Sequence, residues 1–421
     1  MQQRTESIPQ NWALRFFTIW VGQAFSLFGS ALVQFALVWW LTKESGSATV
    51  LATSSLVALL PQIFLGPFVG ALVDRWNRRL IMITADAGIA LATLMLFFLF
   101  ATKQVQIWHV YIILAIRSLG QSFHQPAMTS STSLMIPDQH LARVAGANQT
   151  LQGLQAIFAP PLGALLLEIY STQNVLLIDI ATAAIAILPL IVVHIPQPSR
   201  QRMKDVESSE ETSFVHDLRE GFAYVFKWKG LLGLILLAML LNFLLIPTQS
   251  LFPLIITKIF HGGATELGWA ESVFGVGIIT GGILLGVWGG FKRRIITSFS
   301  GILGIGIGIV VTGIIPGTMF PVLLAANFLI GFTQAFANGP LMAIIQSTVS
   351  PDMQGRVFSL LGAGAAAMMP LSLLIAGPVS DQLGIRFWYI FGGSICILMT
   401  LASLFIPAIM NIENNRVVVA D

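Results

Sequence analysis

The sequence predicts an all-α integral membrane protein with two related halves of six transmembrane helices each. Of its 421 residues, 55% are hydrophobic and only 10% are charged, whereas about 25% of the residues are charged in an ordinary soluble domain. The apolar residues gather in long runs with polar segments between them, and the mean hydropathy is +0.82. A residue pattern of the first half also returns in the second half. This composition excludes a water-soluble fold.

Twelve apolar runs are long enough to cross a bilayer, which takes about 20 predominantly apolar residues. The first half contains residues 13–41, 48–73, 80–102, 106–132, 141–168 and 173–194. The second half contains residues 231–258, 265–290, 294–314, 317–347, 354–380 and 385–409. We therefore expect an N-terminal six-helix bundle over residues 1–195 and a C-terminal six-helix bundle over residues 230–421.

A charged stretch, residues 196–229, separates the two halves, and we expect it to be a solvated cytoplasmic linker. Its later part carries apolar side chains at helical spacing, namely Phe214, Leu218, Phe222 and Val225. Such a pattern predicts an amphipathic helix that lies at the membrane surface.

The positions of Lys and Arg predict the orientation of the chain, because cytoplasmic loops carry an excess of these residues. With the N-terminus inside, 17 of the 22 basic residues fall in inner segments and four fall in outer loops, while Arg117 lies within a span. An odd number of spans would not give this distribution. Both termini are therefore expected on the cytoplasmic side.

The fourth span and the loop after it share a pattern with the tenth span and its loop. Seven residues recur at an offset of 213 or 214 positions. They are Gln121, Phe123, Pro126, Pro137, Asp138, Arg143 and Val144 in the first half, and Gln334, Phe336, Pro340, Pro351, Asp352, Arg356 and Val357 in the second. In transporters, a repeat of this kind indicates parallel halves with a substrate site between them near the membrane midplane.

The loop after the second span reads Gly-Ala-Leu-Val-Asp-Arg-Trp-Asn-Arg-Arg. Its glycine, Gly70, allows a neighbouring helix to approach closely, and Asp74 can pair with a cation or a helix N-terminus of the other half. Arg78 and Arg79 can reach Asp86, about two turns into the third span. We interpret the set as a cytoplasmic gate, although basic residues alone would also serve as membrane anchors. The gate residues are Gly70, Asp74, Arg75, Arg78, Arg79 and Asp86.

The corresponding loop of the second half keeps Gly286 and a basic cluster over residues 292–294, but it has Gly290 where the acid would stand. A complete gate is therefore expected only in the first half. Small residues four apart in and after the eighth span predict close helix packing. They are Gly277, Gly281, Gly282, Gly286 and Gly290.

Ionisable residues within spans are costly unless they face a cavity or a partner. Asp86 and Asp179 are the two acids that lie clearly within spans, and Arg117 is the basic residue there. A carboxyl group in a low-dielectric site can gain or lose a proton as water access changes. We predict that Arg117 is a functional residue and that Asp179 is the site of the proton or of a cationic substrate. Two alternatives stay open: Arg117 could only brace the bundle, and Asp179 could be a permanently protonated brace.

Polar and aromatic residues of the first, seventh and tenth spans are candidates for a large amphipathic substrate cavity. Each of the polar ones could instead be a hydrogen bonder between helices. The candidates are Gln23, Gln34, Phe35, Asn242, Phe243, Gln249, Gln334, Phe336 and Asn338.

The loop over residues 70–79 resembles the signature of the major facilitator superfamily, Gly-x-x-x-Asp-Arg/Lys-x-Gly-Arg-Arg/Lys. It departs from the signature at Asn77, which replaces the usual glycine. Asn tolerates left-handed backbone geometry, so the tight turn can persist. The resemblance implies the major facilitator fold and a network that closes the cytoplasmic side in the outward-facing state. It also implies that Arg117 belongs to a proton relay.

Four further phrases resemble the macrolide-efflux branch of the drug:proton antiporters, and the likeness covers nearly the whole chain. They are residues 17–24, 65–70, 116–120 and 355–360. This resemblance implies proton-driven export of macrolides or similar hydrophobic compounds, and a location in the bacterial cytoplasmic membrane.

We therefore expect a multi-pass secondary transporter that exports hydrophobic drugs by proton antiport with alternating access. An exporter of an endogenous metabolite, such as a siderophore, is an alternative with the same fold. An uncoupled facilitator, a channel or a lipid-moving protein is an alternative of a different class.

An enzyme is not expected, because the sequence has no nucleotide-binding loop, metal-ligand cluster or nucleophile arrangement. No cofactor or metal is expected, and the proton-motive force would supply the energy. The basic residues are scattered between apolar runs and the net charge is only +3, so nucleic acid is not an expected partner. The expected partners are the lipid bilayer, a small hydrophobic substrate and protons. We expect the protein to be a monomer.

Overall fold

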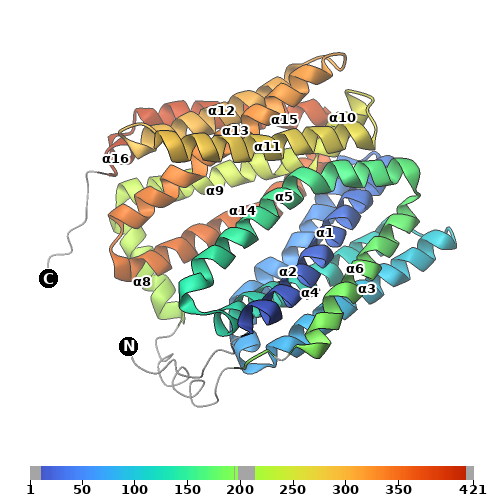
Figure 1. The fold of residues 1–421 in the computed structure, drawn as a ribbon. Coiled ribbons are helices and arrows are strands. Elements are labelled where there is room, and N and C mark those ends of the chain that lie inside the picture. Colours follow the sequence, from blue (N-terminus) through green and yellow to red (C-terminus); the bar gives the residue numbers. More distant parts are fainter. Residues whose placement is uncertain (1–10, 194, 198–213, 414–421) are drawn as a thin grey trace. The chain divides into compact units, whose positions relative to one another are not determined.

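A computed structural model describes residues 11–193, 195–197 and 214–413 (Figure 1). Every regular element within these ranges is a helix. The chain divides into two compact units. Unit 1 holds the chain up to Leu41 and from Val57 through the sixth helix, and unit 2 holds Thr42–Leu56 and all later helices. Most of the expected linker, residues 198–213, lies outside the described residues.

Unit 1 is built from six long helices, and an apolar cluster ties them together. The helices are α1 (Trp12–Ser45), α2 (Ala48–Arg75), α3 (Arg78–Ala101), α4 (Ile107–Met135), α5 (Asp138–Ile169) and α6 (Thr172–Val192). Each helix contributes at least one buried residue to the cluster, in order Phe16, Val69, Met82, Ala127, Val144 and Leu190. The six helices of unit 1 therefore share one packed apolar cluster.

Unit 2 contains the remaining helices. They are α8 (Phe214–Lys227), α9 (Lys229–Ser250), α10 (Phe252–Lys258), α11 (Ala264–Trp288), α12 (Arg294–Ile314), α13 (Phe320–Thr348), α14 (Pro351–Leu383), α15 (Ile385–Leu404) and α16 (Pro407–Met410). The expectation of one continuous helix over residues 231–258 is wrong, because α9 ends at Ser250 and α10 begins at Phe252. Pro253 lies in the first turn of α10, a position that proline tolerates because its missing N–H would have no helical partner there.

The all-helical fold class with its membrane spans is confirmed. Among the described residues, eleven helices are long and apolar enough to cross a membrane. The one expected span that is missing from these eleven is the fourth, residues 106–132. It corresponds to α4, which is long enough to cross a membrane. Helix α4 carries Arg117 and His124, both buried. Its lower hydropathy therefore comes in part from polar side chains that point into the protein.

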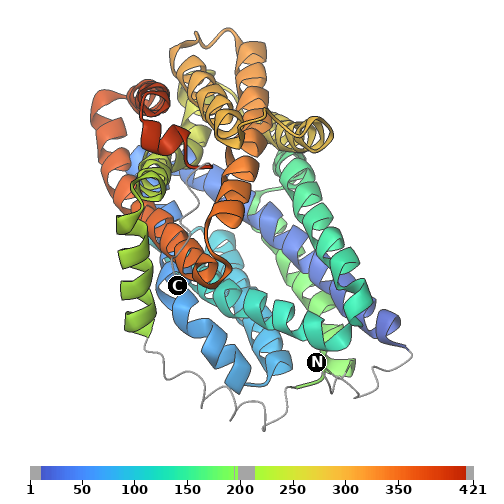
Figure 2. The same ribbon diagram turned by 90° about the vertical axis from the view of Figure 1, so that its left-hand side faces the viewer.

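Glycines allow the helices of unit 2 to pack with their backbones in contact. Helices α11, α12 and α13 lie side by side in both views (Figures 1 and 2). A Cβ atom at Gly281 would lie 2.9 Å from the Cα of Phe332, and one at Gly301 would lie 2.7 Å from a backbone atom of Phe336. Both distances are shorter than real Cβ contacts. Small residues permit this close approach of helices in a membrane.

The expected helix after the linker is present as α8, and it packs on α14. Glu220 forms an ion pair with Arg356 at 2.9 Å, and Val225 is buried. Phe222 and Phe226 are exposed, so α8 has one packed and one open face over its described side chains. Its location at a membrane surface stays a prediction.

Thr42–Leu56 groups with unit 2, although these residues lie within the predicted N-terminal bundle. The physical reason is a cap on the start of α2. The carboxylate of Asp381, at the end of α14, accepts hydrogen bonds from the Ser47 hydroxyl at 2.7 Å and from the backbone N–H groups of Ala48 at 2.7 Å and Thr49 at 2.9 Å. A negative charge at a helix N-terminus satisfies unpaired N–H groups and the helix dipole.

We expect Asp381→Ala to lower the stability of unit 2, because it removes all three of these bonds. Loss of an N-cap costs about 1 kcal/mol. The thermal unfolding midpoint of the purified protein in detergent should fall by a few degrees. Gln382→Ala, at the neighbouring exposed position, is the matched control and should leave the midpoint unchanged. Equal midpoints for the two variants would contradict the capping role.

Candidate functional site

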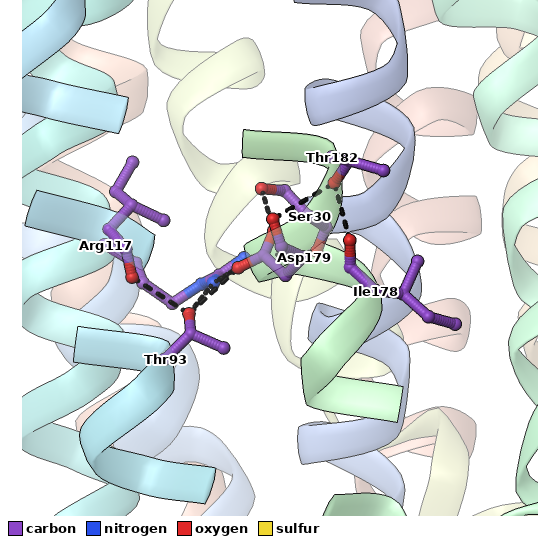
Figure 3. Close-up of polar contacts among 7 residues, drawn as sticks. Ser30, Thr93, Arg117, Ile178, Asp179 and Thr182 are labelled. Atoms are coloured by element: carbon purple, nitrogen blue, oxygen red, sulfur yellow. Dashed lines mark hydrogen bonds and ion pairs between the residues drawn. The ribbon is translucent and has the colours of Figure 1, made fainter. Parts of the chain in front are cut away.

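A polar centre lies inside unit 1, where four helices each present one side chain (Figure 3). Helix α1 provides Ser30, α3 provides Thr93, α4 provides Arg117 and α6 provides Asp179. Asp179 and Arg117 are 1% and 7% exposed. The sequence predicts Arg117 and Asp179 as coupling residues, and the structure brings them into direct contact.

The carboxylate of Asp179 is surrounded by donors. Arg117 Nη1 forms an ion pair with Asp179 Oδ2, and the Ser30 hydroxyl donates to Asp179 Oδ1 at 2.8 Å. Thr93 Oγ1 lies 2.9 Å from Asp179 Oδ2 and accepts from Arg117 Nη1 at 2.8 Å. Arg117 Nη2 also donates to the Ser30 carbonyl at 3.3 Å. Both charges are therefore held by hydrogen bonds as well as by each other.

Helix α1 can approach this centre because Gly29 precedes Ser30 on α1. A Cβ atom at Gly29 would overlap with the side chain of Thr182 on α6. Thr182 is itself anchored, since its hydroxyl donates to the Ile178 carbonyl at 2.9 Å (Figure 3). The close approach of α1 and α6 places Ser30 within hydrogen-bond distance of Asp179.

Asp86 does not take part in the expected gate, and this part of the prediction is wrong. Its carboxylate accepts from Gln23 Nε2 at 2.9 Å and lies 3.5 Å from His124 Nε2. All three residues are buried. Asp86 points into the bundle between α1 and α4, so Arg78 and Arg79 at the beginning of α3 cannot reach it. His124 was not among the predicted site residues, although a histidine within a span is a detectable signal.

The arginines of the loop bind closer to the end of the bundle. Arg78 Nη2 donates to Asp74 Oδ1 at 2.7 Å, and Arg78 Nη1 donates to the Ser130 carbonyl at 2.9 Å. Arg79 donates to the carbonyls of Leu190 and Ile191. These two carbonyls lie in the last turn of α6, where backbone acceptors have no helical partner. Arg79 therefore caps α6.

Asn77 adopts a different role from the one expected. Its φ of −69° and ψ of 108° are extended, so no left-handed turn is needed here. Its side chain accepts from the backbone N–H groups of Arg79 at 3.0 Å and Leu80 at 3.3 Å. Asn77 is therefore the N-cap of α3, which glycine, lacking a side chain, could not provide in the same way.

The remaining gate residues are exposed. Gly70, Asp74 and Arg75 all lie at the end of α2. Apart from the adjoining part of α2 itself, no heavy atom of the described residues lies within 4 Å of a Cβ position at Gly70. The close approach of a neighbouring helix at Gly70 and the gating role of the set stay predictions.

A contact between a tryptophan and a phenylalanine occurs at this end of each unit, although the two tryptophans do not stand at corresponding positions of the repeat. Trp76 stacks on Phe123 with ring centroids 6.2 Å apart, and Trp288 contacts Phe336 at 6.0 Å. The basic clusters correspond, because Arg294 Nη1 lies 3.4 Å from the Ala343 carbonyl, the counterpart of the Ser130 carbonyl bound by Arg78. The acid at position 74 has no counterpart, since Gly290 stands there with φ of 82°.

Comparisons with known proteins identify the family. The model of the Major Facilitator Superfamily matches residues 19–252 and 247–414. The chain belongs to this superfamily. Macrolide efflux protein A of Streptococcus pyogenes is 36% identical over 353 residues, covering 84% of this chain and 86% of the relative. Macrolide efflux protein A of Enterococcus faecalis is 35% identical over 318 residues, covering 76% and 97%. The resemblance to the macrolide-efflux branch is confirmed.

Solved structures of other major facilitator transporters share the fold. A single-substitution mutant of the nucleoside transporter NupG superposes with a TM-score of 0.72 at 14% identity, covering 93% of this chain and 98% of that one. A bacterial homologue of the human lysosomal transporter Spinster gives a TM-score of 0.66 at 12% identity, covering 96% and 97%. These structures show the fold alone, while membership of the superfamily makes the protein a multi-pass membrane transporter.

The cavity candidates fall into three groups by exposure. Gln34, Gln249 and Asn338 are exposed within their units. Phe35 is buried against Gly163, Gln23 binds Asp86, and Phe336 packs on Phe332. The others, Asn242, Phe243 and Gln334, are partly buried. Asn242 donates to the Ala238 carbonyl of its own helix at 2.9 Å, so this hydrogen bond does not join two helices. A shared substrate cavity stays a prediction.

Glu271 is an acid within a span that the sequence analysis missed. It lies in the second turn of α11 and is partly buried. The described residues provide no hydrogen bond or ion pair to its carboxyl group. An acid inside an apolar run was the available signal, and its place near the end of the predicted span 265–290 made it less conspicuous than Asp179.

Proposed function

We propose that this protein exports hydrophobic drugs such as macrolides across the bacterial cytoplasmic membrane in exchange for protons. The buried pair of Arg117 and Asp179 carries this proposal. The names of the relatives support the substrate class, since two of them are macrolide efflux proteins and a third, with 23% identity, is the multidrug efflux pump Tap of Mycolicibacterium fortuitum. The excess of basic residues in the inner segments supports cytoplasmic termini.

The chemistry of coupling follows from competition for one carboxylate. When Asp179 is ionised it holds Arg117, which stays charged under all physiological conditions. A proton that binds Asp179 removes the negative charge, and Arg117 then keeps only Thr93 and the Ser30 carbonyl as neutral partners. The two protonation states therefore favour different arrangements of α4 and α6. A proton bound from outside and released inside would drive alternating access, with no cofactor.

The test is uptake of a radiolabelled macrolide by inverted vesicles or proteoliposomes that hold the monomeric protein under an imposed proton gradient. We expect accumulation against the concentration gradient, and we expect a protonophore to abolish it. Equal accumulation with and without the protonophore would favour an uncoupled facilitator. No macrolide transport by a protein that moves a siderophore would favour a metabolite exporter.

A further inference from the structure

We propose that Asp86 and His124, steadied by Gln23, form a second proton-binding site in unit 1, through which the transported proton passes. The inference deepens the proposed function and rests on it. Gln23 and His124 are each 2% exposed, and Asp86 is 4% exposed. The three come from α1, α4 and α3, so the site depends on the packing of the bundle.

The position of this site repeats that of the first centre. Gln23 and Ser30 are seven residues apart on α1, Asp86 and Thr93 are seven apart on α3, and Arg117 and His124 are seven apart on α4. Seven residues make about two helical turns, or about 10 Å along an axis, and return to the same face. The same three helix faces thus carry two polar layers at different depths.

Apolar packing keeps the two layers separate. Ile89 lies between Asp86 and Thr93 on α3 and is buried. Its side chain covers Gly120 of α4, where an added Cβ would lie only 2.9 Å from it. Within the described part of unit 1, no hydrogen bond joins a side chain of one layer to a side chain of the other. The layer of Asp86 and His124 is therefore a site of its own and not an extension of the Arg117 centre.

The layer of Asp86 and His124 contains ring nitrogens that can bind a proton. Neither ring nitrogen of His124 has a hydrogen-bond partner among the described residues, and neither does the side-chain oxygen of Gln23. Buried polar atoms without a partner cost about 1–3 kcal/mol each. Histidine is the side chain whose charge ordinarily changes between about pH 5 and 8. A proton on His124 would turn its contact with the Asp86 carboxylate into an ion pair.

Other charged or titratable groups lie toward the ends of the bundle or in the first centre. Those of helices α1 to α6, besides Asp86 and His124, are Arg15, Lys43 and Glu44 on α1, Asp74 and Arg75 on α2, Arg78 and Arg79 on α3, His109, Tyr111 and Arg117 on α4, Asp138, His140, Arg143 and Glu168 on α5, and Asp179 on α6. His124 and Asp86 are therefore the titratable pair between the Arg78 and Arg117 levels.

The transfer conserves protons. Protonated Asp179 gives its proton, through water that enters between the two layers, to a ring nitrogen of neutral His124. Asp179 then becomes a carboxylate, which Arg117 neutralises. The imidazolium formed is neutralised by the Asp86 carboxylate. Release toward the end of the bundle that holds Arg78 restores neutral His124. The contact of Ile89 with Gly120 must open for the first transfer, which ties proton movement to a change in helix packing.

Nitrogen-15 NMR of the full-length protein in lipid bilayers, labelled at histidine, tests the site without transport. The signals absent from His124→Gln belong to His124. We expect them to change from imidazolium to neutral between about pH 5 and 9, and to do so at lower pH in Asp86→Asn, which loses the stabilising carboxylate. His124 in one protonation state across this range would overturn the proposal. If His124→Gln does not fold, the signals displaced by Asp86→Asn provide the assignment.

Transport measurements on the wild-type protein and on His124→Gln distinguish the second proton site from the proposed function. The ratio of gradient-driven macrolide uptake to gradient-free macrolide exchange should fall at least about tenfold in His124→Gln. It should stay at the wild-type value in His261→Asn, at a histidine outside unit 1 with φ of 52° that Asn tolerates. A wild-type ratio in His124→Gln overturns the second site. A wild-type protein that ignores the gradient instead overturns the proposed function, and the NMR titration still decides whether His124 binds a proton.

Discussion

Asp179→Asn should abolish macrolide accumulation driven by a proton gradient, with a loss of at least about tenfold. Asn keeps the size of the side chain but cannot gain or lose a proton. It also cannot neutralise Arg117, whose guanidinium reaches Asp179 and Thr93 together. The measurement is the initial rate of uptake into proteoliposomes with and without the gradient. Asp352→Asn, at an exposed acid at the start of α14, is the matched control.

The same pair makes a distinct prediction about stability. Removal of one partner of a buried ion pair leaves an unpaired charge and costs about 3–5 kcal/mol, whereas replacement of both by apolar residues is often neutral or stabilising. Asp179→Asn should therefore unfold at a lower temperature, and the double variant Arg117→Met, Asp179→Leu should recover the wild-type midpoint. Coupling should stay lost in the double variant. Uphill accumulation by either protein would show that Asp179 is a structural brace.

Gly281→Ala should strongly destabilise unit 2, while Gly282→Ala should not. An added Cβ at Gly281 would lie 2.8 Å from the carbonyl carbon of Phe332 and 2.9 Å from its Cα, so two helix backbones would have to separate. Overpacking of this kind costs about 1–3 kcal/mol and sometimes more. Nothing lies within 4 Å of the corresponding position at Gly282. There, alanine removes the unfavourable helix propensity of glycine, which is about 1 kcal/mol in water.

The two glycine variants differ by one methyl group at adjacent positions, so each controls for the other. Thermal unfolding in detergent, together with the yield of monodisperse protein on size-exclusion chromatography, measures the difference. We expect a lower midpoint and a lower yield for Gly281→Ala, and values at or above wild type for Gly282→Ala. Equal losses in both would mean that α11 tolerates no side chain at all, and would contradict the packing described for α13.

The positions of the long helices were predictable because the bilayer limits what can cross it. A spanning segment must be apolar over about 20 residues, so the local composition of the sequence predicts it. Arg117 and Asp179 were visible for the same reason, since a charge in an apolar run stands out. The break at Leu251 was not predicted, although polar residues 248–250 before it and Pro253 after it were the available signals.

The partners of the predicted site residues were not predictable, because a contact depends on how each helix is rotated and shifted along its axis. Asp86 faces Gln23 and His124 and not the loop arginines, and Gly281 faces α13 while Gly282 does not. Neighbouring residues on a helix point about 100° apart, so a small rotation would exchange such roles.

The sequence by itself therefore determined the class of the protein, its membrane spans and the residues whose burial would be costly. The tertiary structure decided that Arg117 neutralises Asp179, that Asn77 and Asp381 cap helices, and that a histidine lies beside Asp86. Whether a segment can enter the bilayer depends on the apolar residues of that segment alone, so the sequence is enough to predict it. Side-chain pairing is settled only when helices far apart in the chain pack together, since the cost of each buried charge then depends on which side chain lies opposite it.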